Sequence, residues 1–282
     1  MKQTTSRAAV GLAFIVLFAS RASTSDKRQL RYAVKPGATL NLVSDYGAVR
    51  IRAAQNGQIV VAATPASRKV EVDCSQNGNR IELRSRYSEA VSEADGRVDY
   101  EVQVPADTHV VVRTASGPVR VQAIAGDIGV DTDNGDVEVR DANGHVKVRT
   151  VGGSITLDNL HDGFIDATSV GGQVWLHEVT GKSVTVNTTS APINYTGDFS
   201  GAGMYSFSSH SGMIDVSLPA SASVDVSARS VNGTVENDFP FNPPMHSSLT
   251  LVQGKSLAGT SNSGASSLHL RTFSGRIRVK KQ

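Results

Sequence analysis

The sequence has a single cysteine, Cys74, among its 282 residues. An internal disulfide is therefore excluded, and the fold must be held by its core and its hydrogen bonds. The chain also lacks Gly-x-Ser-x-Gly, His-Glu-x-x-His, Cys-x-x-Cys and Walker motifs, the local signatures of several large enzyme classes. We therefore expect no catalytic residues, no metal site and no cofactor.

No hydrophobic run is long enough for an ordinary membrane-spanning helix. The longest charge-free stretch near the start covers residues 8–20, whereas a spanning helix needs about 20 apolar residues. Lys2 and Arg7 precede this stretch and Ala22-Ser23 follow it, which is the layout of a secretory signal peptide. We predict a signal peptide at residues 1–22, with cleavage near Ala22. The mature chain would then be periplasmic, on the cell surface or secreted, with no integral membrane anchor.

A large excess of charge of one sign is also missing. Loss of Lys2, Arg7 and Arg21 with the leader would leave 28 − 3 = 25 basic residues against 26 acidic ones. The mature chain is therefore nearly neutral, and we do not expect nucleic acid as a partner.

Internal repeats dominate the rest of the chain. Turn residues recur at intervals of 18, 18, 19, 20, 20 and 21, and a last one follows after twice 21: Gly117, Gly135, Gly153, Gly172, Pro192, Gly212, Gly233 and Gly275. An alternating strand lies on each side of most of these markers. Alternation buries one face of a strand, and so short a unit needs stacked neighbours to complete a core. We therefore predict an all-β, parallel β-solenoid with coils of about 18–21 residues. An antiparallel meander is the alternative.

The strands before the markers end in small hydroxyl residues that share one inward phase: Thr114, Thr132, Thr150, Thr188 and Thr272. This pattern predicts a ladder of small residues at one corner. Glycine at the marker would supply a positive φ or a close approach of the backbone. In the same register Arg120 and Glu138 would stack as opposite charges on the outside.

The repeat begins after a less regular segment. Residues 23–105 are β-rich, and we interpret them as early coils or a cap, continuous with the repetitive solenoid of residues 106–282. Residues 87–97 would form a loop or a short helix, and residues 239–244 a protruding loop. The last strand, residues 276–281, carries charges that would discourage edge-to-edge association.

Two passages carry a family resemblance. From Tyr100 to Val119 a strand ending in Val-Pro leads into a Thr, Ser-Gly, Val unit, and residues 268–277 close the chain similarly. Both resemble the bacterial putative-adhesin domains of unknown function, which are related to the head-GIN autotransporter adhesins. The resemblance covers nearly the whole mature chain. It implies a β-solenoid on the cell surface or in the periplasm, with no catalytic residues to carry over. At Ala191-Pro192, where Ser-Gly would be expected, one corner should differ.

Acidic residues suggest little chemistry. A metal could be considered at Asp127, Asp131, Asp133, Asp136 and Asp141, but their spacing fits neither an EF-hand nor a nonapeptide calcium repeat. We interpret them as turn and surface residues. Asp215 and Glu236 should lie on neighbouring coils in one outward column, where a carboxylate pair could serve acid–base catalysis. Two solvated acids are the simpler interpretation.

Trp175 marks the better candidate for a binding site. It falls at the outward phase between Val174 and Leu176, and an indole ring can stack on a sugar. The same face should carry Gln173, His177, Thr156, Asp158 and Asn194. Alternatively, a loop or a second subunit covers the ring.

These observations favour an exported, non-catalytic interaction protein. Its partner would be a glycan, an envelope protein or a second copy of the chain. A polysaccharide-active β-helix enzyme is the alternative, by analogy of fold, with residues 239–248 as a loop that could help to build a cleft.

Overall fold

The computed structural model describes residues 28–55, 57–197, 199, 202–243 and 252–282. The signal peptide predicted at residues 1–22 lies outside these ranges, as does part of the predicted 239–248 loop. The described residues form 22 strands and one short helix, α1 (Glu93–Gly96). The prediction of an all-β chain is therefore confirmed, and of the two alternatives for residues 87–97, a loop or a short helix, the structure has the helix. No helix in the described ranges is long and apolar enough to cross a membrane.

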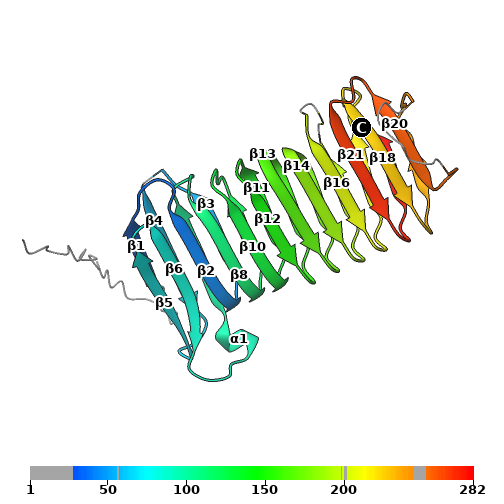
Figure 1. The fold of residues 1–282 in the computed structure, drawn as a ribbon. Coiled ribbons are helices and arrows are strands. Elements are labelled where there is room, and N and C mark those ends of the chain that lie inside the picture. The colour runs from blue at the N-terminus through cyan, green and yellow to red at the C-terminus, as the bar shows by residue number, and fades with distance from the viewer. Residues whose placement is uncertain (1–27, 56, 198, 200–201, 244–251) are drawn as a thin grey trace, which may run out of the picture.

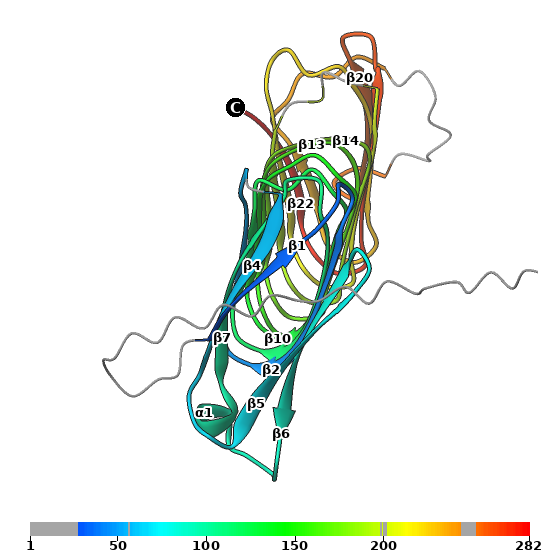
Figure 2. The same ribbon diagram turned by 90° about the vertical axis from the view of Figure 1, so that its left-hand side faces the viewer.

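The strands line up along an elongated stack (Figure 1), and a view from one end shows a flattened, nearly closed tube (Figure 2). We call its two long sides wall A and wall B. In spatial order, wall A consists of β5 (Val70–Asn77), β6 (Arg80–Tyr87), β2 (Thr39–Tyr46), β8 (His109–Ser116), β10 (Ile128–Asn134), β12 (Val146–Thr150), the second halves of β13 (Ile155–Ser169) and β14 (Val174–Thr188), β16 (Met204–Ser209), β21 (Ser266–Thr272), β18 (Val224–Ser230) and β20 (Ser256–Ser261).

Wall B is built in the same way from the strands that follow the corner turns. In spatial order it consists of β1 (Arg28–Ala33), β4 (Gln58–Pro65), β7 (Val98–Val104), β3 (Val49–Ala53), β9 (Val119–Gln122), β11 (Val137–Ala142), the first halves of β13 and β14, β15 (Ile193–Thr196), β17 (Ile214–Leu218), β22 (Ile277–Lys281) and β19 (Val235–Asn237).

Strand directions are mixed. Parallel pairing dominates the repeat, where Val110, Ile128, Val146 and Ile165 are successive Cα partners. Four pairs near the two ends are antiparallel: β1–β4, β4–β7, β5–β6 and β18–β20. The expected parallel arrangement is therefore met only in part, because the sheet ends in strands that turn back on their neighbours.

The order of the strands in space differs from their order in the chain. At the C-terminal end β21 lies between β16 and β18, and β22 lies between β17 and β19. The chain runs outward through β18 and β19, turns back through the antiparallel β20, and then fills the gap that it left. At the other end β2 lies between β6 and β8 in the same manner. A prediction that stacks coils in chain order is therefore wrong at both ends.

This arrangement also corrects the prediction for the last strand. β22 is an interior strand, with Ile277 and Val279 fully buried. Its charges therefore cannot protect an edge. Lys280 binds Asp215 at 2.9 Å, and Arg278 binds Glu236 at 3.1 Å. The strands with one partner in the described residues are β5 and β20 on wall A and β1 and β19 on wall B.

Inward residues of the two walls form one continuous core. Val, Ile and Leu side chains at alternate positions are almost completely buried along the whole stack. Toward the C-terminal half the core becomes aromatic, with Tyr195, Phe199, Tyr205 and Phe207 packed on one another. The buried Tyr195 hydroxyl donates a hydrogen bond to the Val179 carbonyl at 2.7 Å. The tube is thus filled by side chains.

The corner between the walls carries the predicted hydroxyl ladder. Its buried members are Cα partners from strand to strand: Ser44, Thr114, Thr132, Thr150, Ser169, Thr188, Ser209, Thr272 and Ser230. The Gly153 N–H donates to Thr150 Oγ1 at 3.1 Å, so the hydroxyl closes its own turn.

The main role of the glycine markers is to let the backbones of neighbouring coils approach each other closely. A Cβ on Gly153 would overlap the carbonyl of Gly135, although neither residue has a positive φ. The marker assigned to Pro192 is wrong by one residue. Ala191 occupies the glycine position, since its carbonyl faces Gly212 and Ile193 pairs with Val174. At this corner Thr188 Oγ1 donates to the Ala191 carbonyl at 2.8 Å.

Candidate functional site

Strand β14 places Trp175 on the outer surface of wall B. The neighbouring Val174 and Leu176 point into the core and are almost fully buried. Trp175 keeps 47% of its surface exposed, so within the described residues no loop covers the ring. An exposed indole offers a flat apolar face together with one N–H donor.

Strand pairing brings the predicted neighbours to this ring. Thr156 on β13 and Asn194 on β15 are the direct Cα partners of Trp175. Gln173 and His177 lie two residues to either side on the same chain segment, with His177 exposed and Gln173 partly exposed. The five residues therefore share one outer patch, which we call the Trp175 patch. Ligand binding by it stays a prediction.

One side of the patch is bounded by a row of ion pairs. His177 Nδ1 lies 2.9 Å from Asp158 Oδ1, and Asp158 Oδ2 lies 3.7 Å from Arg140. Farther along, Glu138 contacts both Arg140 and Arg120. The predicted pairing of Arg120 with Glu138 is confirmed, at 2.8 Å. Glu138 and Asp158 in this row therefore each have an arginine beside them.

On the other side of the patch lie Asp215 and Glu236, and the prediction that they form a carboxylate pair is wrong. Asp215 and Glu236 are both Cα partners of Arg278, which therefore separates them. The hydrogen bond and the negative charge of Glu236 raise the pKa of the Arg278 guanidinium. The expected adjacency is wrong because β22 is inserted between β17 and β19. Two carboxylates on either side of an arginine do not form an acid–base pair for glycoside hydrolysis.

Two buried polar atoms lie at the edge of the Trp175 patch that faces β17. Asn194 Nδ2 and Asp215 Oδ1 are both buried, and neither has a hydrogen-bond partner among the described residues. Asn194 and Asp215 are Cα partners on β15 and β17. This edge of the patch is therefore polar but carries little accessible charge.

The aspartates considered for a metal are spread over several coils and bind protein donors. Asp136 accepts hydrogen bonds from the Ser154 hydroxyl and backbone N–H, which lower its pKa. Hydrogen bonds from Asn159 and Gln122 lower the pKa of Asp141. Asp127 accepts from the His145 N–H at 3.3 Å. The described residues contain no cluster of three or more His, Cys, Asp or Glu side chains arranged for a metal.

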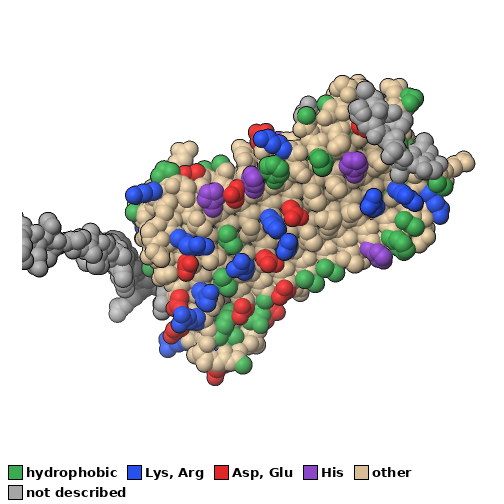
Figure 3. Space-filling model, viewed as in Figure 1, with side chains coloured by type: hydrophobic (Ala, Val, Ile, Leu, Met, Phe, Trp, Pro, Cys, Tyr) green, Lys and Arg blue, Asp and Glu red, His purple; other side chains and the backbone are tan. Residues whose placement is uncertain are grey.

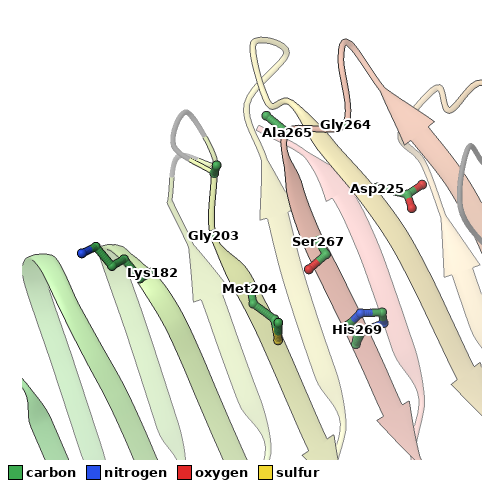
Figure 4. Close-up of a pocket in the computed structure, with 9 residues that line it drawn as sticks. Lys182, Gly203, Met204, Asp225, Gly264, Ala265, Ser267 and His269 are labelled. Carbon is green, nitrogen blue, oxygen red and sulfur yellow. The ribbon is translucent and has the colours of Figure 1, made fainter.

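A second surface feature was not predicted from the sequence. A hollow of about 510 Å³ lies on wall A near the start of β16, and Met204, Ser267 and His269 line it with Lys182 and Asp225 (Figure 4). Asp225 already accepts a hydrogen bond from Thr260 at 2.7 Å. The hollow depends on the pairing of β16 with β21. No sequence signal could have found it, because these strands are far apart in the chain.

The chain is similar to one family model and to two solved structures. The family model described as Toastrack DUF4097 matches residues 39–280. A solved structure described as a putative adhesin, from Bacteroides fragilis NCTC 9343, is 10% identical, with a TM-score of 0.54 over 90% of this chain and 97% of that chain. Another, a putative cell adhesion protein from Clostridium sporogenes ATCC 15579, is 12% identical, with a TM-score of 0.24 over 91% and 100%. The comparison with curated proteins found no match. At 10% identity the likeness to the first structure concerns the fold alone.

Proposed function

The chain belongs to the Toastrack DUF4097 family, and from this premise we propose that it is an exported, non-catalytic β-solenoid that binds a glycan through the Trp175 patch. The adhesive role named for the Bacteroides fragilis structure supports this proposal only by analogy of fold. The observation that carries it is the exposed Trp175 ring between the polar side chains of Thr156 and Asn194.

Support for the solenoid comes from the repeat itself. Successive parallel partners lie 18 or 19 residues apart from Val110 to Ile165, and 21 apart from Val184 to Tyr205. The antiparallel strands at the two ends would act as caps on this stack, as the end units of repeat proteins do. The signal peptide predicted at residues 1–22 supports export, and it stays a prediction, as does the relation to head-GIN adhesins.

The charges around the patch indicate an uncharged ligand. Asp158 is engaged by His177 and Arg140 on one side, and Lys280 and Arg278 engage Asp215 and Glu236 on the other. A charged ligand would have to replace one partner of an existing ion pair. Its binding would therefore be weakened by the loss of the attraction within that pair. A neutral sugar could stack on the Trp175 ring and exchange hydrogen bonds with Thr156, Gln173 and Asn194.

A glycan array tests this function directly. The mature chain, from Ser23 onward, is applied beside a Trp175→Ala variant, with neutral, uronic-acid and sulfated glycans compared. We expect selective binding of neutral glycans that falls about five- to tenfold in the variant, because one stacked ring contributes on the order of 1–1.5 kcal/mol.

Phe164→Ala is the matched control, because Phe164 is 49% exposed but belongs to the half of β13 that lies in wall A. Its binding should equal that of the unchanged chain. Absence of binding in all three proteins, or an equal loss in both variants, contradicts the Trp175 patch. Binding of acidic glycans alone contradicts a neutral ligand.

A further inference from the structure

One corner of the stack carries an unbroken row of seven residues, one from each of seven neighbouring coils. Successive backbone hydrogen bonds of 2.7–3.0 Å define it, because the carbonyl of each member accepts from the N–H of the residue that follows the next member. The six accepting carbonyls belong, in spatial order, to Asp133, Val151, Val170, Thr189, His210 and Phe273. Their donors, in the same order, are Gly152, Gly171, Ser190, Ser211, Ser274 and Asn232. Val231 is the seventh residue. We call these seven residues, from Asp133 to Val231 in this spatial order, the corner ridge.

The side chains of the corner ridge are unusually apolar for an outer surface. Val151, Val170, Phe273 and Val231 keep 53%, 45%, 45% and 43% of their surface exposed. Phe273 also stacks on His210, with ring centroids 5.1 Å apart and nearly parallel planes. In Figure 3, apolar side chains follow the lower edge of the stack, where the strands of wall A end. Two exposed apolar pairs, Val151 with Val170 and Phe273 with Val231, therefore lie in one row on either side of Thr189 and His210, and clustered apolar exposure of this kind is typical of an interaction surface.

The two ends of the ridge have opposite charge. It begins with the exposed Asp133, and Asp136 lies in the same turn. At the other end Lys255 Nζ donates a hydrogen bond to the Val231 carbonyl at 3.1 Å, so a cation caps the last residue. Arg276 lies in the turn next to Val231. In spatial order, the corner ridge therefore has an acidic end, an apolar pair, a polar centre and a second apolar pair, and the cation Lys255 lies beside its last residue.

We propose that two copies of the chain pack ridge against ridge in an antiparallel, two-fold dimer. A two-fold axis at the central Thr189 would place Val151 opposite Phe273 and Val170 opposite His210. It would also place Asp133 opposite Val231 of the second copy, whose carbonyl is bound by Lys255. Self-complementarity of this kind is what an isologous interface requires, and it closes at two subunits. Complementary charges at both ends would fix the antiparallel direction.

Sedimentation equilibrium of the mature chain, over about 1 to about 500 μM, tests the dimer. We expect a monomer–dimer equilibrium whose dissociation constant rises at least tenfold in Phe273→Ser. Phe164→Ser is the matched control, since Phe164 is 49% exposed and also contacts a histidine ring, that of His145. It should leave the dissociation constant unchanged. A chain that stays monomeric throughout, or an equal effect of both variants, overturns the proposal. The corner ridge would then be a surface for a different protein.

Charge exchange tests the direction of packing. Asp133→Lys and Lys255→Asp should each weaken the dimer, because each would bring like charges together at both ends of the interface. The double variant restores opposite charges and should recover most of the affinity. Failure of the double variant to recover, with unchanged circular dichroism, overturns the antiparallel arrangement. Both variants keep Trp175, so their effects are separate from glycan binding.

Discussion

At the scale of single residues, the hydroxyl ladder determines how each corner is closed. A buried hydroxyl accepts the N–H of the glycine three residues later at Thr150, Ser209, Thr272 and Ser230. Serine and threonine reach their own turns in this way because their side chains are short. The hydroxyl ladder therefore repeats the same hydrogen bond to a glycine N–H at several corners, in addition to placing a small side chain there.

Thr150 and Thr132 give a matched test of this role. Both are buried, but Thr132 Oγ1 has no hydrogen-bond partner among the described residues, whereas Thr150 Oγ1 accepts from Gly153. Thr150→Val should lower the free energy of unfolding by about 1–3 kcal/mol, because it leaves a buried N–H unpaired. Thr132→Val should change it by less than about 0.5 kcal/mol. Urea denaturation measures both, and equal losses would show that the hydroxyl contributes only packing.

Glycine at the corner gives a second residue-scale prediction. A Cβ on Gly153 would meet the backbone of Gly135 and Asp136, and backbone atoms of a neighbouring coil cannot rotate away. Gly153→Ala should therefore cost about 3 kcal/mol. At Gly129, in the middle of β10, a Cβ would meet only the Val110 carbonyl oxygen, at 3.9 Å. Gly129→Ala should instead stabilise the chain by about 0.5 kcal/mol. Thermal unfolding distinguishes these outcomes, and a neutral Gly153→Ala would refute the steric argument.

At the scale of elements, the inserted coil of β21 and β22 holds the C-terminal end together. β21 pairs with β16 on one side and β18 on the other, and β22 does the same between β17 and β19. Leu268, Leu270, Ile277 and Val279 fill the core at this level. The outer strands β18 and β19 therefore reach the rest of the stack mainly through residues that come later in the chain.

Deletion of residues 266–282 tests this dependence. Amides of β18 and β19 should lose their protection against hydrogen exchange, while β8, β10 and β12 keep theirs, because each coil is supported only by its neighbours. Deletion of Gln282 alone is the control, since it removes one hydrogen bond to the Leu218 carbonyl. Hydrogen exchange with mass spectrometry reads both. Retained protection in β18 and β19 would mean that they pair directly with β16 and β17, as chain order alone predicts.

At the scale of the whole molecule, two surfaces with different chemistry lie on one rigid stack. The Trp175 patch is on the outer surface of wall B, and the corner ridge follows the turns that join the walls. Parallel pairing sets equivalent residues of successive coils side by side. A short pattern in one repeat therefore becomes a continuous stripe along the molecule, and surface function is distributed over coils instead of being gathered in a pocket.

Much of this was available from the sequence, because burial in a strand follows from alternation alone. The period, the inward phase of Thr114 and Thr150, the all-β class and the outward position of Trp175 all depend on residues within one or two repeats. Short-range patterns suffice where each coil repeats the geometry of its neighbour.

Only the tertiary structure decided which coil lies beside which. All the strands share one alternating pattern, so nothing in residues 266–282 distinguishes a terminal coil from one inserted between β16 and β18. Arg278 consequently separates Asp215 from Glu236, and Phe273 stacks on His210 to continue the corner ridge. Alternation specifies the face that a strand buries, whereas the neighbour that covers its edge is fixed by backbone hydrogen bonds over long separations in the chain.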